Sequence, residues 1–143
     1  MFNFFKDKKD ENGNNLLSKI GSLLIHIAKI DEKYTAKERE IISKTLIELG
    51  AEQKELESLL NNAEKNEENA NQILDFTKEI KNIDEKSKKK IIEALWTVVF
   101  SDGSSDMYEE NLMRRLSGLL YLDNKVVGDI KKIVIKKNND LSS

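Results

Sequence analysis

The sequence predicts an all-α fold, a single compact helical domain of about seven helices, on three observations. The 143 residues contain no Pro, the residue that most strongly disrupts a helix interior. Apolar residues recur every three to four positions along most of the chain, which is the period of one face of an α-helix. A helix–acidic loop–helix pattern also occurs twice, over residues 24–38 and 95–109.

The two copies of this pattern share one register. In each, an apolar run ends at an Asp, a short polar loop follows, and a Glu opens the next helix. Asp31 lies 71 positions before Asp102, and Glu38 lies 71 positions before Glu109. The same offset relates five apolar pairs: Leu24 with Leu95, Ile27 with Val98, Ala28 with Val99, Ile41 with Leu112 and Ile42 with Met113. We interpret the pattern as an internal duplication that yields two duplicated helix–acidic loop–helix units.

Four helices are predicted in the first half of the chain. The helix over 15–31 carries a continuous Leu and Ile stripe, and the helix over 36–49 stops at Gly50, which suits a left-handed C-cap. The helix over 52–63 has few apolar residues and is expected at the surface. An Asn-Glu-Glu-Asn run is typical of a cap followed by an acidic first turn, so a fourth helix is predicted over 67–82.

Three helices are predicted in the second half. The helix over 85–101 places Trp96 on its apolar stripe, so this side chain is expected in the core. The helix over 107–121 follows the second acidic loop. The helix over 124–137 has a Lys-rich last turn, which suits the negative end of the helix dipole. Its expected apolar stripe contains Val126, Val127, Ile130, Ile133 and Val134. We divide the chain into a flexible leader (1–14), one helical domain (15–137) and a C-terminal tail (138–143).

Composition restricts the class of partner. Lys and Arg number 24 against 26 Asp and Glu, for a net charge of −2, so no overall charge attracts nucleic acid or an anionic membrane. The basic run 88–90 and the pair 114–115 are interpreted as solvated helix faces. No apolar run reaches the roughly 20 residues of a membrane span, and residues 1–15 lack the features of a secretory signal. We therefore expect a cytoplasmic protein with a protein partner, without nucleic-acid binding or stable membrane insertion.

The composition restricts any metal site in this chain mainly to oxygen ligands. It has no Cys and a single His, which excludes disulfides, thiolate metal sites and a Cys nucleophile and disfavours a His-dependent triad. No nucleophile or phosphate loop accompanies the carboxylates, so we predict that the chain is not an enzyme. A bound metal would be held mainly by oxygen, which favours calcium or magnesium over zinc.

The acidic loops have a structural and a functional interpretation. They are not EF-hands, because Asp102 to Glu109 spans eight positions instead of twelve. Thr35 with Glu38, and Asp106 with Glu109, fit capping boxes. Asp31 and Asp102 each end a helix, where free carbonyls disfavour a carboxylate but suit a hard cation. The alternative is that these two Asp residues turn toward the loop N–H groups and hold the turn.

The paired motif resembles the tellurite-resistance TerB-like family. The stretch FSDGSSDMYEENLMRRLSGLLYL is similar to the second family motif, an apolar helix, Asp-Gly, variable residues and Glu. The stretch IAKIDEKYTAKEREIISKTLIELG is similar to the first, with Glu32 in place of the usual Gly. The resemblance runs over about residues 15–135 and implies a helical domain linked to tellurite resistance and general stress response.

The resemblance also implies a divalent-metal site on the acidic loops. Carried over by motif position, the expected ligands are Asp31, Glu38, Asp102 and Glu109, with Asp106 and Glu110 beside them. The predicted function is a non-enzymatic module that binds a divalent cation through these loops. The alternative is a metal-independent protein-interaction module that uses the same acidic face. Tellurite chemistry does not follow from the family, because the chain has no thiol to reduce or ligate tellurite.

Overall fold

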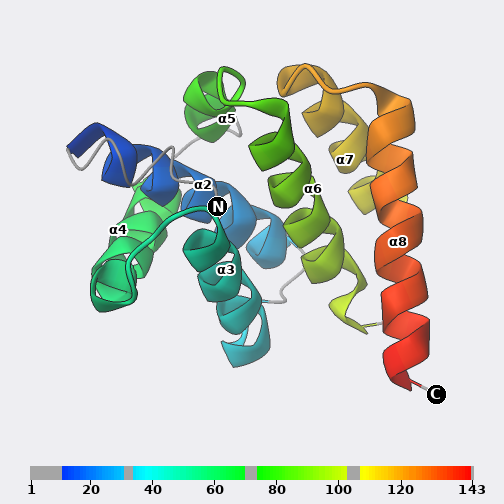
Figure 1. Cartoon of the computed structure of the whole chain (residues 1–143), viewed down its shortest axis with the longest axis horizontal. Helices are drawn as coiled ribbons and strands as arrows, with labels where there is room; N and C mark the ends of the chain where they lie inside the picture. The colour runs from blue at the N-terminus through cyan, green and yellow to red at the C-terminus, as the bar shows by residue number, and fades with distance from the viewer. Residues whose placement is uncertain (1–10, 31–33, 70–73, 103–106, 143) are drawn as a thin grey trace.

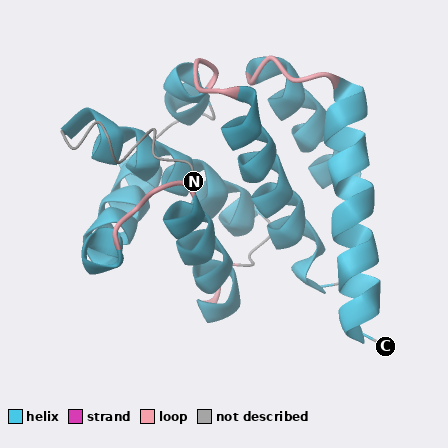
Figure 2. Ribbon diagram, viewed as in Figure 1, coloured by secondary structure: helices cyan, strands magenta, loops and turns pink. Residues whose placement is uncertain are grey.

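The computed structural model describes residues 11–30, 34–69, 74–102 and 107–142, and every regular element within them is helical (Figure 2). The all-α prediction is therefore confirmed. The elements are α2 (Glu11–Ile30), α3 (Ala36–Glu48), the 3-10 turn η1 (Gln53–Glu55), α4 (Leu56–Asn69), α5 (Leu74–Ile80), α6 (Glu85–Val99), the 3-10 turn η2 (Phe100–Asp102), α7 (Met107–Leu119) and α8 (Asn124–Ser142).

Helix α6 joins the two halves of the bundle. In Figure 1, α3, α6 and α8 run side by side, with α2 behind α3 and α6. Helix α6 packs against α2 and α3 of the first half and against α8 of the second. On the outer flanks, α2 also packs against α4 and α5, and α7 packs against α8. One continuous apolar core runs through this arrangement.

The predicted apolar stripes account for most of this core. Helices α2 and α6 contribute the largest share of fully buried Leu, Ile and Val side chains. Trp96 is 3% exposed, as its place on the α6 stripe predicted. Ile133 is an exception, because it was expected on the α8 stripe but is 52% exposed, whereas Val134 beside it is buried. No described helix combines the length and apolar character needed to cross a membrane.

Helices α2 and α4 approach each other closely at Gly21. A Cβ atom at this position would lie 3.0 Å from the Cβ of Ala63, closer than ordinary van der Waals contact. The neighbouring Ser22 hydroxyl donates to the carbonyl oxygen of Ala63 at 2.8 Å. The small residue thus lets the helix backbones meet, and the hydroxyl ties them together.

The boundaries of the predicted fourth helix, 67–82, are wrong. Helix α4 continues through the Asn-Glu-Glu-Asn run to Asn69, and α5 covers only Leu74–Ile80. Tertiary contacts stabilise the extension, because Asn66 Nδ2 donates to Ser18 Oγ at 3.2 Å and Glu67 lies 2.8 Å from Lys29 Nζ. Two other ends also differ from prediction: α2 begins at Glu11, and α8 extends to Ser142.

Local structure repeats in the 71-residue register. Helices α3 (36–48) and α7 (107–119) have corresponding ends, and each is followed by a residue with positive φ, Gly50 at 118° and Tyr121 at 58°. The C-terminal hydrogen bonds match as well: Gly50 to Ile47 and Ala51 to Leu46 in the first unit, Tyr121 to Gly118 and Leu122 to Ser117 in the second. Both ends are Schellman-type caps. The superposition of the complete units stays a prediction.

Candidate functional site at the two acidic loops

The predicted site residues lie at the junctions between α2 and α3 and between η2 and α7. Asp31 and Asp106 lie outside the described residues, and Asp102 is described only as the last backbone position of η2. Glu38 and Glu109 occupy the third position of α3 and of α7, and each is 4% exposed. The structure thus places the two Glu side chains in equivalent, buried positions at helix N-termini.

Glu38 forms the predicted capping box with Thr35. The Thr35 backbone N–H donates to Glu38 Oε1 at 3.1 Å, and the Thr35 hydroxyl donates to the same oxygen. Burial raises the pKa of Glu38, but hydrogen bonds from Thr35 and from the Ser101 hydroxyl outweigh that effect and hold the pKa below its ordinary value. Glu38 is therefore an ionised, buried carboxylate at neutral pH.

The start of α3 borders the start of the second acidic loop. Lys37 Nζ donates to the carbonyl oxygen of Ser101 at 3.0 Å, and Ser101 also contributes to the lowered pKa of Glu38. Ser101 belongs to η2 and immediately precedes Asp102. Both segments lie at the same end of the bundle in Figure 1, at its lower side. The two junctions predicted to carry ligands are thus in direct contact at this point.

The corresponding part of α7 differs in its surroundings. Glu110, expected beside the site, pairs with Lys131 of α8 at 2.7 Å, so its carboxylate is engaged with the neighbouring helix. The two residues that open α7, Met107 and Tyr108, are 78% and 61% exposed. The acidic end of the molecule therefore also presents two large, exposed apolar side chains.

Helix α4 holds both sides of the first loop. Before the loop, Glu67 lies 3.1 Å from His26 Nδ1 and 2.8 Å from Lys29 Nζ. After the loop, Tyr34 donates to Glu64, which also accepts from Arg39 Nε at 3.2 Å. Burial and the Glu64 carboxylate raise the pKa of Tyr34. The single His of the chain thus contacts Glu67 within this polar network, which sequence reasoning missed although Glu64 and Glu67 are spaced to share a helix face.

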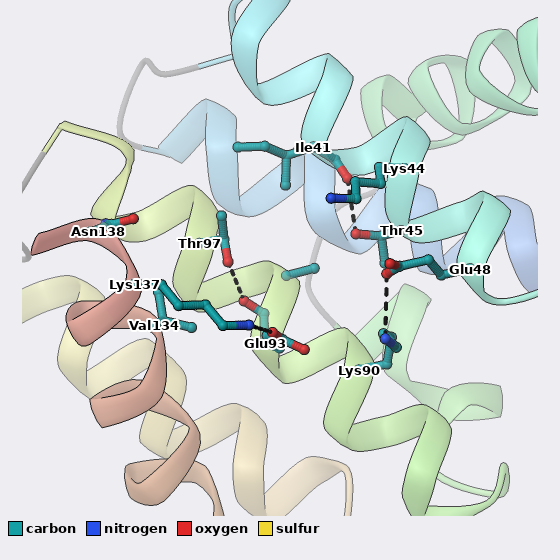
Figure 3. A pocket seen from close by; sticks show the side chains of 11 residues that line it. Ile41, Lys44, Thr45, Glu48, Lys90, Glu93, Thr97, Val134, Lys137 and Asn138 are labelled. Carbon is teal, nitrogen blue, oxygen red and sulfur yellow. Dashed lines mark hydrogen bonds and ion pairs between the residues drawn. The ribbon is translucent and has the colours of Figure 1, made fainter. Parts of the chain in front are cut away.

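A groove of about 390 Å³ lies between α3, α6 and α8 (Figure 3). Sequence reasoning did not predict it, because its walls come from three helices distant in the chain. Its lining contains acidic, basic, uncharged polar and apolar side chains. These are Ile41, Lys44, Thr45, Glu48, Lys90, Glu93, Ala94, Thr97, Val134, Lys137 and Asn138.

Most polar groups of the groove are already satisfied. Lys90 pairs with Glu48 at 3.5 Å, and Lys137 pairs with Glu93 at 3.0 Å. The hydroxyls of Thr45 and Thr97 and the amide of Asn138 donate to backbone carbonyl oxygens. The ion pairs therefore tie α3 to α6 and α6 to α8, and we interpret the groove as a structural seam.

Among side chains that the structure describes, no three His, Asp or Glu residues gather as metal ligands. Three of the five predicted ligands, Asp31, Asp102 and Asp106, have no described side chain. The metal site therefore stays a prediction.

A comparison with protein-family models matched residues 18–132 to a model described as Tellurite resistance protein TerB. Searches of curated proteins and of solved structures returned no match. The matched range begins within α2 and ends within α8, so it includes both acidic junctions.

Proposed function

We propose that this chain, which belongs to the TerB family of tellurite resistance proteins, is a non-enzymatic cytoplasmic module that binds a divalent cation at its acidic end. The proposed ligands are Asp31, Glu38, Asp102, Glu109 and Asp106. The module would serve tellurite resistance or a general stress response through a protein partner. Calcium and magnesium suit the oxygen-only donor set better than zinc does.

The observation that carries this proposal is the contact between Ser101 and the start of α3. Lys37 of the first junction bonds to Ser101, the residue before Asp102, and Ser101 also contributes to the lowered pKa of the adjacent Glu38. A single junction offers two or three carboxylates, too few for the roughly six to eight oxygens that calcium takes. Two junctions in contact would supply more carboxylates to one shared shell than either junction alone.

The ionisation of Glu38 supports the same proposal. Its pKa lies below the ordinary value although the side chain is buried, so the group carries a negative charge at neutral pH. A buried carboxylate gains most from a compensating cation, because solvent screens it little.

The second candidate is a metal-independent interaction module, favoured by the exposure of Met107 and Tyr108. Large exposed apolar side chains bordered by charged residues are typical of protein-binding surfaces. In this alternative, a partner with a basic, partly apolar surface binds the acidic end, and the carboxylates serve recognition instead of coordination.

The test is thermal unfolding of the full chain with calcium, magnesium, manganese or zinc, supported by titration calorimetry. At a hundredfold excess over Kd a bound ion stabilises the fold by about 2.7 kcal/mol, which raises Tm by about 10 °C for a chain of this size. Asp102→Asn should remove most of that rise. Asp84→Asn is the matched control, because Asp84 caps α6 at the far end of that helix and Asn caps equally well.

The outcomes separate the two candidates. A rise in Tm that Asp102→Asn removes and Asp84→Asn preserves supports the cation site. If millimolar concentrations of all four ions leave Tm unchanged, the cation proposal is wrong. If no ion changes Tm and a Met107→Ser, Tyr108→Ser double variant loses binding to its protein partner, the results support the interaction module.

A further inference from the structure

Tyr121 has a backbone conformation that is unfavourable for its residue type. Its φ of 58° lies in the left-handed region, which costs an ordinary L-residue free energy and which Gly adopts readily. The equivalent position in the first unit is Gly50, with φ of 118° and the same pattern of C-cap hydrogen bonds. The turn thus requires a left-handed residue, and the second unit places a bulky aromatic there. An unfavourable backbone conformation of this kind points to a function of the side chain.

The Tyr121 ring is exposed and is flanked by two cations. It is 69% exposed, and the Nζ atoms of Lys81 and Lys88 each lie 5.7 Å from its centroid. These are cation–π distances. Lys81 comes from the turn between α5 and α6, Lys88 from α6, and Tyr121 from the turn between α7 and α8. Figure 1 shows both turns at the upper end of the bundle, away from the junction of α3 with η2.

Neither ammonium group has a carboxylate partner within the described part of the chain. Lys88 was expected on a solvated face, but its residue is only 8% exposed, so most of its side chain is buried and its ammonium lies beside the Tyr121 ring. Nearby acidic groups are engaged elsewhere: Asp84 accepts from Ser87, Glu85 pairs with Lys89, and Asp123 accepts from the Lys125 backbone. The charges of the two ammonium groups are therefore not compensated by a described carboxylate.

We propose that Tyr121, Lys81 and Lys88 form a docking site for an acidic segment of a partner protein. Carboxylates of that segment pair with the two ammonium groups, and the phenol donates a hydrogen bond while its ring packs against the segment. Charge-assisted bonds of this kind are about twice as strong as neutral ones. Tyr is among the residues enriched at the centres of protein interfaces. The site is separate from the proposed cation site and does not depend on it.

The small number of cations in the cluster favours a short acidic segment over a nucleic acid or an anionic membrane. Asp84, Glu85 and Asp123 lie within a few residues of the cluster in the sequence, and the whole chain carries a net charge of −2. A polyanionic backbone would meet these carboxylates along with the two lysines, and its binding depends on many phosphate contacts. A pair of Asp or Glu side chains needs only the small area between Lys81, Lys88 and the phenol.

The test uses a fluorescein-labelled hexaglutamate peptide, the full chain at low salt with EDTA, and fluorescence anisotropy. EDTA removes any contribution from the proposed cation site. We expect saturable binding that weakens as salt is added. Tyr121→Gly should weaken binding by about tenfold or more, on the scale of an interface hot spot, while Tm stays unchanged or rises because Gly relieves the left-handed backbone.

A double variant Lys81→Met, Lys88→Met tests the cations independently. Met keeps the buried stem of Lys88 and removes its charge, so binding should fall by a similar factor without loss of fold. Lys89→Met is the matched control, because Lys89 is exposed and paired with Glu85, and it should bind as the parent does. Backbone amide shifts on peptide addition should centre on residues 81, 88 and 121.

Three results would overturn the proposal. The first is an absence of saturable hexaglutamate binding to the parent chain. The second is unchanged binding in either Tyr121→Gly or the double Lys variant. The third is tighter binding of inorganic phosphate or a single-stranded oligonucleotide than of the peptide, which would identify a phosphate site instead.

Discussion

The indole nitrogen of Trp96 in α6 donates a 3.1 Å hydrogen bond to the carbonyl oxygen of Val127 in α8. The ring is 3% exposed and lies 5.8 Å from the ring of Phe100, centroid to centroid. Lys131 places its Nζ 5.3 Å from the same indole and also pairs with Glu110 of α7. Trp96 thus connects α6 to α8 and, through Lys131, to the helix that follows the second acidic loop.

Trp96→Ala should lower the free energy of unfolding by about 3–5 kcal/mol, because it empties a large volume of core. Trp96→Phe should cost less, since it keeps most of the apolar volume but leaves the Val127 carbonyl without its donor. Urea denaturation of the two variants measures both values. An unchanged midpoint in Trp96→Ala would mean that this position is not part of the core.

Gly21→Ala should destabilise the chain, whereas Gly128→Ala should stabilise it. Both positions are helical, but an added Cβ at Gly21 would lie 3.0 Å from Ala63 Cβ, and at Gly128 it would meet nothing within 4 Å. Ala gains about 0.5–1 kcal/mol over Gly in a helix interior, and overpacking costs about 1–3 kcal/mol. Thermal unfolding should therefore move in opposite directions for the two variants, and equal shifts would contradict the close approach of α2 and α4.

Glu38 should make part of the stability acid-sensitive. Its pKa in the folded chain lies below the ordinary value of 4.5, so its contribution is fully present above that pH. The contribution is lost as the pH falls through the lowered folded pKa, because the unfolded state then binds the proton first.

Glu38→Gln tests this dependence, since Gln can also close a capping box but does not titrate. The drop in Tm between neutral pH and pH values below 4.5 should be smaller than in the parent. Glu40→Gln, at an exposed position of the same helix, is the control and should keep the parent's pH dependence. Identical acid profiles for Glu38→Gln and the parent would show that the carboxylate is not stabilised as described.

The internal repeat gives a structural prediction. In a crystal of the full chain, residues 36–51 should superimpose on residues 107–122, including the left-handed residues Gly50 and Tyr121. The matching helix ends and C-cap hydrogen bonds motivate this expectation. A different crossing of α2 with α3 than of α6 with α7 would contradict a duplication of whole units.

Much of the fold was predictable because its helices bury amphipathic stripes that periodicity reveals. The stripe of α6 predicted both the helix and the burial of Trp96. The prediction was wrong where tertiary contacts replace local signals: Asn66 resembles a helix cap but bonds to Ser18 on α2, so α4 continues past it. Ile133 had the right spacing for the core, yet it lies on the exposed side of α8.

The candidate site was predictable only in its local parts. The Thr35–Glu38 capping box follows from four consecutive residues. The contact of the neighbouring Lys37 with Ser101 joins residues 64 positions apart in the sequence, and a local sequence pattern cannot predict such a contact. The prediction that Lys88 lies on a solvated helix face was wrong for the same reason, because only the packing of the turn between α7 and α8 brings Tyr121 to its ammonium.

The central position of α6 has a consequence for synthesis on the ribosome. Helices α2 and α3 pack against α6, whose residues are translated only after the whole first half of the chain. Until Val99 has left the exit tunnel, the first half must expose apolar side chains of α2, and such surfaces promote aggregation. Cotranslational folding should therefore begin late, and arrest-peptide measurements on nascent chains should register a folding force only once α6 has emerged in full.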